Sequence, residues 1–324
     1  MLAVVLAAGR GMRLGRLTDD RPKALMPIAG KPMIARVLDM LEAEGVDRFI
    51  VVVHPEDKEL LEELTRSSRK TRIWQAYQAE RRGMADAVGC AAPLVQRTGA
   101  AEFLLASCDN LYPPRHPSNL IVRRREERLD AALTLMWTSQ QEVASSAGVV
   151  VEDGLVTDIA EKPAANQIPS YGGHLRALSA PSLYALTPLI LDYVPRVPLS
   201  RRNEREFPHA LRLLIADGGR VGGQLVKDRM TLTHPRDLLD INRHFLRAAP
   251  EAAVIRPQIP PDATVVPPVR IEAGAQVGAR CRIGPEVYLE TGCSVQRGAV
   301  VRRAVVLRGA SVKAQQVVDG SVIA

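Results

Sequence analysis

The sequence predicts an α/β protein in which a Rossmann-like, mostly parallel sheet with helices on both faces is followed by a parallel β-helix. Two patterns lead to this prediction. Over the first ~235 residues, short apolar runs typical of buried strands alternate with segments typical of amphipathic helices. From Ile259 onward, aliphatic residues recur at every sixth position, which is the pattern of hexapeptide repeats. We therefore expect two domains, residues 1–248 and residues 249–324.

The N-terminal part begins with an apolar run at residues 2–8, which indicates a buried first strand. A helix is expected to begin at Pro32 and to end at Gly45, with one apolar face between them. Further strands are expected at 49–53, 73–77, 103–106 and 133–137, and a hairpin at 148–151 and 155–159. Further helices are expected around 60–64 and at 182–194, 208–217 and 236–248.

The C-terminal part has an unbroken period of six. The aliphatic positions are Ile259, Val265, Ile271, Val277, Ile283, Leu289, Val295, Val301 and Leu307. This resembles the left-handed β-helices, in which three hexapeptides form one triangular coil, and it implies about three to four coils here. Residues 312–323 slip out of phase and are expected to cap the stack, as terminal repeats often do.

Composition excludes several classes of protein. The apolar fraction of 46% and charged fraction of 24% are ordinary for a globular protein, and no apolar run is long enough to span a membrane. The cysteines Cys90, Cys108, Cys281 and Cys293 lack C-x-x-C spacing, so we expect reduced thiols in a cytoplasmic protein. The histidines likewise lack metal-binding spacing and are interpreted as surface residues.

A nucleic-acid partner is not expected. The net charge of +7 is modest, and phosphorylated small substrates would explain part of it. The one dense basic run, residues 123–125, is followed by Glu126 and Glu127, which indicates a solvated helix face. An aromatic fraction of 4% leaves few platforms for stacking bases.

The turn after the first strand carries the strongest chemical signal. Gly9 and Gly11 let backbone N–H groups approach phosphate oxygens, and Arg13 and Lys23 follow closely as cations. Neither the dinucleotide fingerprint nor the P-loop pattern is present, because position 14 is a leucine. These features together predict a polyphosphate-binding segment.

The composite G-x-G-x-R-L…L-T…P-K-x-L-x-P-I-x-G-K-P-M, from Gly9 to Met33, resembles the signature of the sugar-1-phosphate nucleotidyltransferases, in particular the glucose-1-phosphate thymidylyl- and uridylyltransferases. The resemblance implies transfer of a nucleotidyl group from an NTP to a sugar 1-phosphate, giving an NDP-sugar and pyrophosphate. It also implies Mg²⁺ as the cofactor. The attacking phosphate monoester, with a second pKa of ~6, is already mostly dianionic at neutral pH, so no general base is required.

The resemblance also assigns roles to individual residues. Arg13 and Lys23 hold the triphosphate, and Asp109, directly after an apolar strand, binds Mg²⁺. The nucleotide base is contacted by Ala8, Gly9 and Gly11 in the first turn and by Gln78 and Gly83 after the strand at 73–77. In Glu161-Lys162-Pro163, Lys162 contacts the sugar phosphate and Glu161 the sugar hydroxyls.

The sequence departs from the family pattern at two places. Met84 replaces a threonine near the base, and Thr231 falls where the family has a second metal-binding aspartate. Asp228 is the candidate replacement for that carboxylate. A second hypothesis is therefore a catalytically weak regulatory or assembly subunit that binds sugar nucleotide.

Other properties are left open by the sequence. An acyltransferase activity is not expected, because no histidine follows His244. We expect a homo-oligomer formed through the β-helix or the first domain, because exposed β-helix ends tend to associate. The segment around 140–180 is expected to select the sugar, but neither the sugar nor the base is specified, nor whether the β-helix is regulatory or structural.

Overall fold

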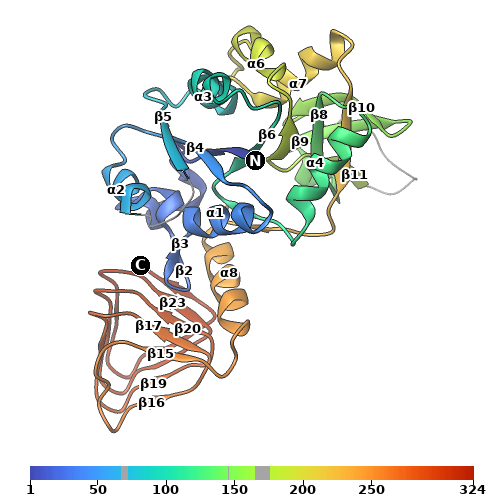
Figure 1. Cartoon of the computed structure of the whole chain (residues 1–324). Coiled ribbons are helices and arrows are strands. Elements are labelled where there is room, and N and C mark those ends of the chain that lie inside the picture. Colours follow the sequence, from blue (N-terminus) through green and yellow to red (C-terminus); the bar gives the residue numbers. More distant parts are fainter. Residues whose placement is uncertain (67–71, 145, 165–175) are drawn as a thin grey trace. The chain divides into compact units, whose positions relative to one another are not determined.

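The computed structural model describes residues 1–66, 72–144, 146–164 and 176–324 (Figure 1). The chain groups into two compact units, which do not follow the order of the sequence. The first unit consists of Met1–Gly9 and Val37–Arg229, and the second of Arg10–Arg36 and Met230–Ala324. The segment 10–36, which carries most of the predicted phosphate-binding signature, thus groups with the C-terminal residues. A domain boundary between residues 248 and 249 stays a prediction.

The first unit is built on one ten-stranded sheet with the order β11-β9-β10-β13-β8-β12-β6-β1-β4-β5. Its strands are β1 (Leu2–Leu6), β4 (Arg48–Val53), β5 (Arg72–Tyr77), β6 (Phe103–Ser107), β8 (Ala131–Ser139), β9 (Ala147–Glu152), β10 (Leu155–Glu161), β11 (Arg176–Ser179), β12 (Leu183–Leu186) and β13 (Val221–Leu225). The strands β6, β1, β4 and β5 are parallel, whereas most pairings in the other half are antiparallel. The predicted α/β class is confirmed, but the sheet is mixed rather than mostly parallel.

Helices cover both faces of this sheet. They are α2 (Lys58–Arg66), α3 (Met84–Thr98), α4 (His116–Glu126), α5 (Gln140–Val143), α6 (Ile190–Tyr193) and α7 (Phe207–Ala216); α1 (Met33–Ala43) spans the change from one unit to the other. Val4 belongs to the core cluster that includes α3 and α7. Its neighbour Val5 points to the opposite face and is also fully buried, as expected for a sheet packed on both sides.

The segment expected to form a helix at 182–194 is instead a strand followed by a short helix. Leu183–Leu186 forms β12, which pairs with β6 and β8, and Ile190–Tyr193 forms α6. All four residues of β12 are buried. A short apolar run of this kind fits a buried strand or a buried helix equally well. Here the run forms a strand because it pairs with β6 on one side and with β8 on the other. The hairpin of β9 and β10 around Asp153 is confirmed.

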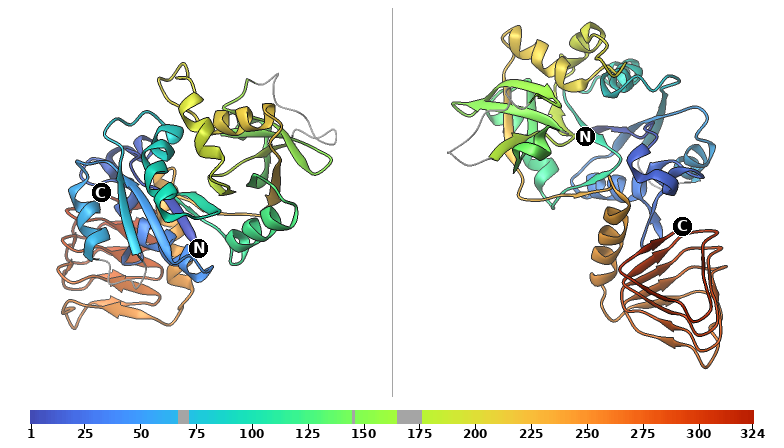
Figure 2. Two further views of the ribbon diagram at one scale, coloured as in Figure 1. Left: turned by 45° about the horizontal axis from the view of Figure 1, so that its top comes forward. Right: turned by 180° about the vertical axis from the view of Figure 1, so that it is seen from behind.

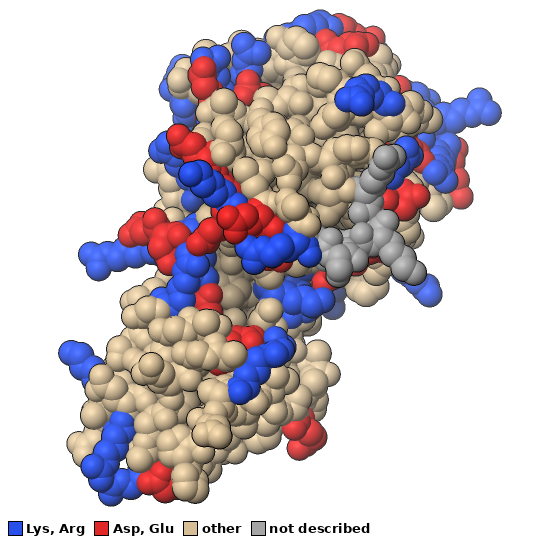
Figure 3. All heavy atoms as spheres, turned by 60° about the vertical axis from the view of Figure 1, so that its left-hand side comes forward, with Lys and Arg blue, Asp and Glu red and all other residues tan. Residues whose placement is uncertain are grey.

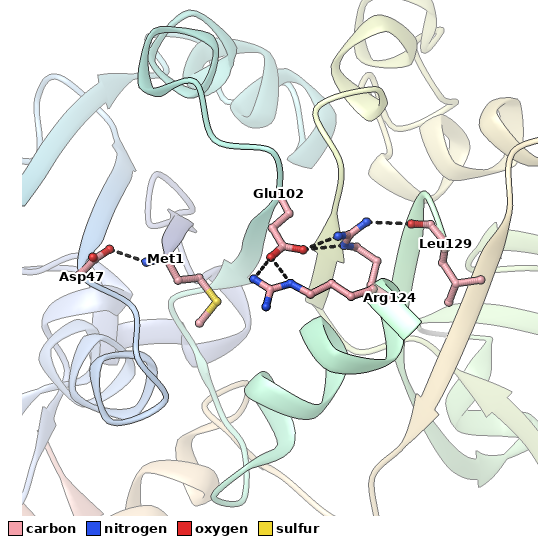
Figure 4. Close-up of polar contacts among 6 residues, drawn as sticks. Met1, Asp47, Glu102, Arg124 and Leu129 are labelled. Atoms are coloured by element: carbon pink, nitrogen blue, oxygen red, sulfur yellow. Dashed lines mark hydrogen bonds and ion pairs between the residues drawn. The ribbon is translucent and has the colours of Figure 1, made fainter. Parts of the chain in front are cut away.

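The basic run at 123–125 forms specific pairs rather than a freely solvated face. Glu102, which precedes β6, accepts hydrogen bonds from Nε of Arg124 at 2.8 Å and Nε of Arg125 at 2.6 Å (Figure 4). Arg123 donates to the carbonyl of Gly223. On the face drawn in Figure 3, Lys and Arg side chains likewise lie interspersed with Asp and Glu.

Two histidines are buried, contrary to the expectation that all lie on the surface. His54 and His116 are each 6% exposed. The ring of His116 hydrogen-bonds Oγ1 of Thr134 at 2.9 Å, and burial lowers the pKa of His116 to about 4. His174 lies outside the described residues.

The second unit contains the signature segment, one long helix and the β-helix. Its elements before the β-helix are η1 (Met12–Thr18), η2 (Lys23–Leu25), β2 (Pro27–Ile28), β3 (Lys31–Pro32), β14 (Met230–Thr231) and α8 (Pro235–Arg247); β7 (Asn110–Leu111) and η4 (Val194–Arg196) belong to the first unit. The β2–β3 hairpin packs on α8 through Asn242, which is fully buried. Asn242 donates to the carbonyl of Pro27 at 2.9 Å and accepts from the N–H of Ala29 at 2.7 Å.

The β-helix stacks its strands into three parallel sheets (Figure 2). The strands are β15 (Ala253–Ile255), β16 (Thr264–Val265), β17 (Val269–Ile271), β18 (Gln276–Val277), β19 (Arg282–Ile283), β20 (Val287–Leu289), β21 (Ser294–Val295), β22 (Val300–Arg302), β23 (Ala304–Val306), β24 (Ser311–Val312), β25 (Val317–Asp319) and β26 (Val322–Ile323). Val269 pairs with Val287, 18 residues on, and Val287 pairs with Ala304, 17 residues on. The predicted three-hexapeptide coil is confirmed, and the loss of one residue explains why the last repeats slip out of phase.

Among the described residues, no helix is long and apolar enough to cross a membrane. The four cysteines are free. Cys281 and Cys293 point into the β-helix core, where burial raises the pKa of Cys293 to about 12.

Candidate active site

The predicted site residues of the first unit follow neighbouring parallel strands. Ala8 comes after β1, Gln78 directly after β5 and Asp109 after β6. The strands β6, β1, β4 and β5 are adjacent and run in the same direction, so their carboxyl ends share one edge of the sheet. Open α/β sheets bind their ligands beyond this edge.

The first turn is tied to the segment after β5 by an arginine. Nε of Arg81 donates to the carbonyl of Ala8 at 2.7 Å, and the same guanidinium pairs with Asp57 at 3.3 Å. Burial raises the pKa of Asp57 above its usual value, although Arg81 opposes this. Ala8 is buried, whereas Gly9 is exposed. The backbone of Ala8 is therefore held by the segment that follows β5, and the role of both segments in binding a nucleotide stays a prediction.

The side chain of Gln78 is fixed in orientation. It is 4% exposed, and Nε2 donates to the carbonyl of Gly83 at 3.0 Å and to Oδ2 of Asp86 at 2.9 Å. Both partners accept only, so the amide nitrogen and oxygen of Gln78 cannot exchange places.

Gly83 directly precedes α3 as its N-cap residue, and two features of this position require a glycine. Its φ of 98° is strained for residues with a side chain, and a Cβ there would lie 2.7 Å from the carbonyl oxygen of Arg205. The same carbonyl accepts the N–H of Ala85 at 2.9 Å. Gly83 therefore allows the close approach of two chain segments beside Gln78.

Asp109 lies in a polar network at the end of β6. Its Oδ1 accepts from the hydroxyl of Ser107 at 2.7 Å and from Nδ2 of Asn110 at 2.9 Å. The guanidinium of Arg229 donates to Oδ1 of Asn110. Nε of Arg229 is buried with no hydrogen-bond partner among the described residues. Asp109 is thus oriented by its neighbours, and a cation stands close by.

The donor set fits Mg²⁺ that is shared with a substrate. Within the described ranges, no three His, Cys, Asp or Glu side chains gather to hold a metal. Magnesium is often bound through one or two carboxylates, with phosphate oxygens and waters as the other ligands, and Asp109 can supply one carboxylate. Asp228 is exposed, and its role as a second ligand stays a prediction.

Lys162 follows β10 and has a constrained backbone. Its φ of 47° lies in the left-handed region, and its N–H donates to the carbonyl of Ser146 at 2.7 Å. The side chain is exposed. Oε1 of Glu161 lies 3.8 Å from the guanidinium of Arg202. Such strain in a residue other than glycine is concentrated at functional sites.

The predicted triphosphate residues lie in the second unit, where Gly11 and Lys23 are in contact. Gly11 has a φ of 71°, and a Cβ there would lie 2.8 Å from Cβ of Lys23. Lys23 is 9% exposed at the start of η2, whereas Arg13 is exposed on η1. The glycine turn and the lysine of the signature therefore form one local structure.

Sequence reasoning missed three residues at these places. Arg81 holds the first turn, Asp86 orients Gln78, and Arg229 reaches the network of Asp109. Asp86 directly follows the Gly83-Met84-Ala85 segment that was compared with the family, but its contact with Gln78 carries no sequence signal. Arg81 and Arg229 belong to no motif.

A buried, mixed sheet with helices on both faces, and with oriented polar groups at its carboxyl edge, defines the α/β class of protein. Comparison with known proteins then identifies the family. The nucleotidyl transferase family model matches residues 2–246, and a model described as the GMPPB C-terminal domain matches residues 265–324. The chain belongs to the nucleotidyl transferase family and is a sugar-1-phosphate nucleotidyltransferase-type enzyme with a C-terminal β-helix, as the signature had indicated.

Individual relatives are informative about both parts of the chain. The UTP–glucose-1-phosphate uridylyltransferase AglF of Haloferax volcanii is 31% identical over 240 residues, covering 73% of this chain and 93% of the relative. The probable mannose-1-phosphate guanylyltransferase 1 of Oryza sativa is 27% identical over 325 residues, covering 100% of this chain and 86% of the relative. A solved UDP-glucose pyrophosphorylase, in complex with UDP-glucose, shares the fold with a TM-score of 0.66 at 20% identity, over 76% of this chain and 98% of that one.

Proposed function

We propose that this enzyme transfers a nucleotidyl group from an NTP to a sugar 1-phosphate. A phosphate oxygen of the sugar 1-phosphate forms a new bond to the α-phosphorus, and the bond from that phosphorus to the bridging α,β-oxygen breaks. Pyrophosphate leaves with the bonding electron pair, and the product is an NDP-sugar. No proton has to be removed from the nucleophile, since a phosphate monoester with a second pKa of ~6 is mostly dianionic at neutral pH.

The observation that carries this proposal is the arrangement at the carboxyl edge of β6, β1, β4 and β5. It combines a glycine turn after β1, an oriented Gln78 after β5 and an oriented carboxylate, Asp109, after β6. A glycine turn, an oriented amide and an oriented carboxylate are groups suited to binding the phosphates, the base and the metal ion of a nucleotide.

Catalysis would rest on position and charge. Arg13 and Lys23 bind the triphosphate and neutralise the charge that builds up on pyrophosphate as it leaves. Lys162 binds the phosphate of the sugar 1-phosphate and aligns it for attack, and Glu161 binds sugar hydroxyls. Gln78 and Gly83, with Ala8, Gly9 and Gly11, bind the nucleotide. When bound, Mg²⁺ supplies positive charge between the phosphates, with Asp109 as its protein ligand and Asp228 as a candidate second one.

The second candidate function is a binding subunit with little turnover. Two observations favour it: Thr231 stands where a second metal carboxylate is expected, and Met84 replaces a threonine near the base. A protein with a single carboxylate at the metal relies on substrate phosphates for most of the coordination.

A pyrophosphate-release assay separates the two. The purified chain is incubated with Mg²⁺ and every combination of UTP, dTTP, GTP, ATP and CTP with glucose 1-phosphate and mannose 1-phosphate. We expect release of pyrophosphate for at least one combination, and loss of release in Asp109→Asn. If no combination releases pyrophosphate while calorimetry detects binding of an NDP-sugar, the binding-subunit function holds instead.

We also infer that the enzyme self-associates. The strand β15 is the first of its sheet and pairs with β17 on one side only, and all of its residues are exposed. Apolar edge strands favour pairing with another chain. Val254 and Ile255 lie on this edge and are 36% and 39% exposed.

A further inference from the structure

The β-helix holds the segment that carries Lys23. The contact begins at Arg21, two residues before Lys23, whose side chain is 5% exposed. Its guanidinium pairs with Oε1 of Glu290 at 2.5 Å, and the side chain of Glu290 is itself only 13% exposed. Glu290 directly follows β20, so it stands at a corner of the β-helix.

A second β-helix residue completes this contact. The backbone N–H of Arg308 donates to Oε2 of Glu290 at 2.8 Å, so both oxygens of this carboxylate are used. The side chain of Arg308 donates to Oδ2 of Asp20 and to the carbonyl oxygen of Asp20, each at 2.8 Å. Two neighbouring residues of the signature segment, Asp20 and Arg21, are thus bound by two successive coils of the β-helix.

The other end of the segment is also fixed. Asn242 of α8 binds the carbonyl of Pro27 and the N–H of Ala29. Lys23 and the short helix η2 lie between the two anchors. A chain held at both ends over so few residues has little freedom to move, so each anchor contributes to the position of Lys23.

The anchor at Arg21 cannot be removed without consequence. A buried guanidinium that loses its buried carboxylate partner is poorly compensated, because the other carboxylate near Arg21, that of Asp20 at 3.5 Å, is 56% exposed. The Nε of Arg21 lies 3.5 Å from Oδ1 of Asp20 and has no hydrogen-bond partner among the described residues, whereas the guanidinium donates to Glu290 at 2.5 Å. Loss of Glu290 would therefore displace the segment rather than merely weaken a surface contact.

We propose that Glu290 and Arg308 are positioning residues that hold Lys23 in place for the triphosphate, so that the β-helix is part of the catalytic apparatus. This inference rests on the proposed function, because Lys23 has its role only there. Glu290 and Arg308 are not assigned contact with substrate; they act through Asp20 and Arg21.

The test compares Glu290→Ala, Glu290→Gln and Arg308→Ala with wild type in the full chain. Asp319→Asn is the matched control, because Asp319 accepts from Nε of Arg302 at 2.9 Å in another carboxylate–arginine pair of the same β-helix. Two properties are measured: the kinetic constants for the NTP, and amide hydrogen exchange of residues 19–26. The second readout does not depend on turnover.

We expect Glu290→Ala to lower kcat/KM for the NTP about 10–100-fold, the size of effect that misplacement of a binding group produces. Glu290→Gln and Arg308→Ala should show smaller losses, and KM for the sugar 1-phosphate should change little. Residues 19–26 should exchange faster in all three variants, while the coils of the β-helix and Asp319→Asn stay as in wild type.

Three outcomes would overturn the inference. One is unchanged exchange and kinetics in Glu290→Ala. Another is faster exchange throughout the β-helix, which would mean that Glu290 only stabilises the coils. The third is an equal loss in Asp319→Asn. If Glu290→Ala does not fold, the inference is tested by the kinetic constants and the amide exchange of Arg308→Ala and Glu290→Gln. If wild type releases no pyrophosphate, the proposed function fails, whereas unchanged exchange at 19–26 would independently refute the anchoring role.

Discussion

Single residues differ in how strongly their surroundings constrain them, and Lys162 is the clearest case. Its left-handed φ of 47° costs about 1–3 kcal/mol in a residue with a side chain. We expect Lys162→Ala to lower kcat/KM for the sugar 1-phosphate about 10²–10³-fold, because a cation is removed from the phosphate. Lys162→Gly should lose as much activity. Its free energy of unfolding in urea should nevertheless be about 1 kcal/mol higher than that of wild type, since glycine adopts this φ without strain. Unchanged kcat/KM in Lys162→Ala would refute the role in phosphate binding.

The orientation of Gln78 leads to a prediction about the base. Because both hydrogens of its amide nitrogen are taken by Gly83 and Asp86, the amide oxygen is the group left to face a base. Uracil, thymine and guanine present an imino N–H to such an acceptor, whereas cytosine and adenine present an exocyclic amino group beside a ring nitrogen that repels it. We expect ATP and CTP to be poorer substrates than UTP, dTTP or GTP by about tenfold or more.

Asp86→Ala tests this idea. It frees one hydrogen of Gln78 and allows the amide to turn, so the ratio of kcat/KM between the best NTP and ATP should fall. Asp86→Asn is the matched control, since an asparagine oxygen can still accept from Gln78. A wild-type enzyme that prefers ATP, or a ratio that is the same in both variants, would contradict the prediction.

The sequence predicted the residues that carry motifs and not those that support them. Gly11 and Lys23 were candidates because they belong to one long signature, and Asp109 because it follows an apolar strand; their roles stay predictions. Arg81 and Arg229 could not, because their partners, Ala8 and Asn110, lie 73 and 119 residues away. Such contacts depend on which strand ends are neighbours in the sheet, and that order does not follow the order of the chain.

At the scale of elements, the periodic β-helix and most apolar runs of the first unit were predicted as the structure has them, but the run at 183–186 was not. The β-helix was predicted because each position of a hexapeptide keeps the same face over many repeats, which averages out local ambiguity. The run Leu183–Leu186 has no repeat to support it, and it became a strand only because β6 and β8 lie on either side. In the mostly antiparallel half of the sheet, β8 and the hairpin of β9 and β10 were predicted, but β12 and β13 were not predicted as strands.

The ion pairs of Glu102, which precedes β6, with two arginines of α4 lead to a prediction about stability. Glu102 binds Arg124, whose side chain is 13% exposed, and Arg125, whose side chain is 61% exposed. Removal of Arg124 leaves a largely buried carboxylate without its buried partner, whereas Arg125 is mostly in water. We expect Arg124→Ala to lower the free energy of unfolding by about 1–3 kcal/mol and Arg125→Ala by less than about 1 kcal/mol. Urea denaturation measures both, and equal losses would contradict the argument.

The same pair gives a pH dependence. Burial raises the pKa of Glu102, but hydrogen bonds from Arg125 and Arg124 outweigh it and hold the pKa below the ordinary 4.5. A carboxylate with a lowered folded pKa stabilises the protein above that ordinary value, and the contribution is lost as the pH falls through the folded pKa. The difference in unfolding free energy between wild type and Glu102→Gln should therefore be full at neutral pH and shrink below about pH 4.

On the scale of the whole molecule, the compact units do not follow the order of the chain. Residues 10–36 group with 230–324, so the phosphate-binding signature shares a unit with the β-helix. No local pattern marks this exchange, because one end of the segment lies in the turn after β1 and the other lies inside the continuous helix α1. Removal of the β-helix would therefore remove the hydrogen-bond partners of Asp20 and Arg21. Removal of an appended, independent domain would leave the rest of the chain unchanged.

Self-association is the remaining property of the whole molecule, and the edge of β15 gives its test. Val254 and Ile255 present apolar side chains and unpaired backbone groups at the start of the stack, and a second copy of the chain can cover both. We expect light scattering to give a mass above that of one chain for wild type, and the mass of one chain for the double variant Val254→Lys/Ile255→Lys at equal concentration. Val122→Lys is the control, because Val122 is 46% exposed but lies on α4 in the first unit. If the double variant keeps the wild-type mass, association through the edge of β15 is refuted, and the first unit becomes the candidate site of association.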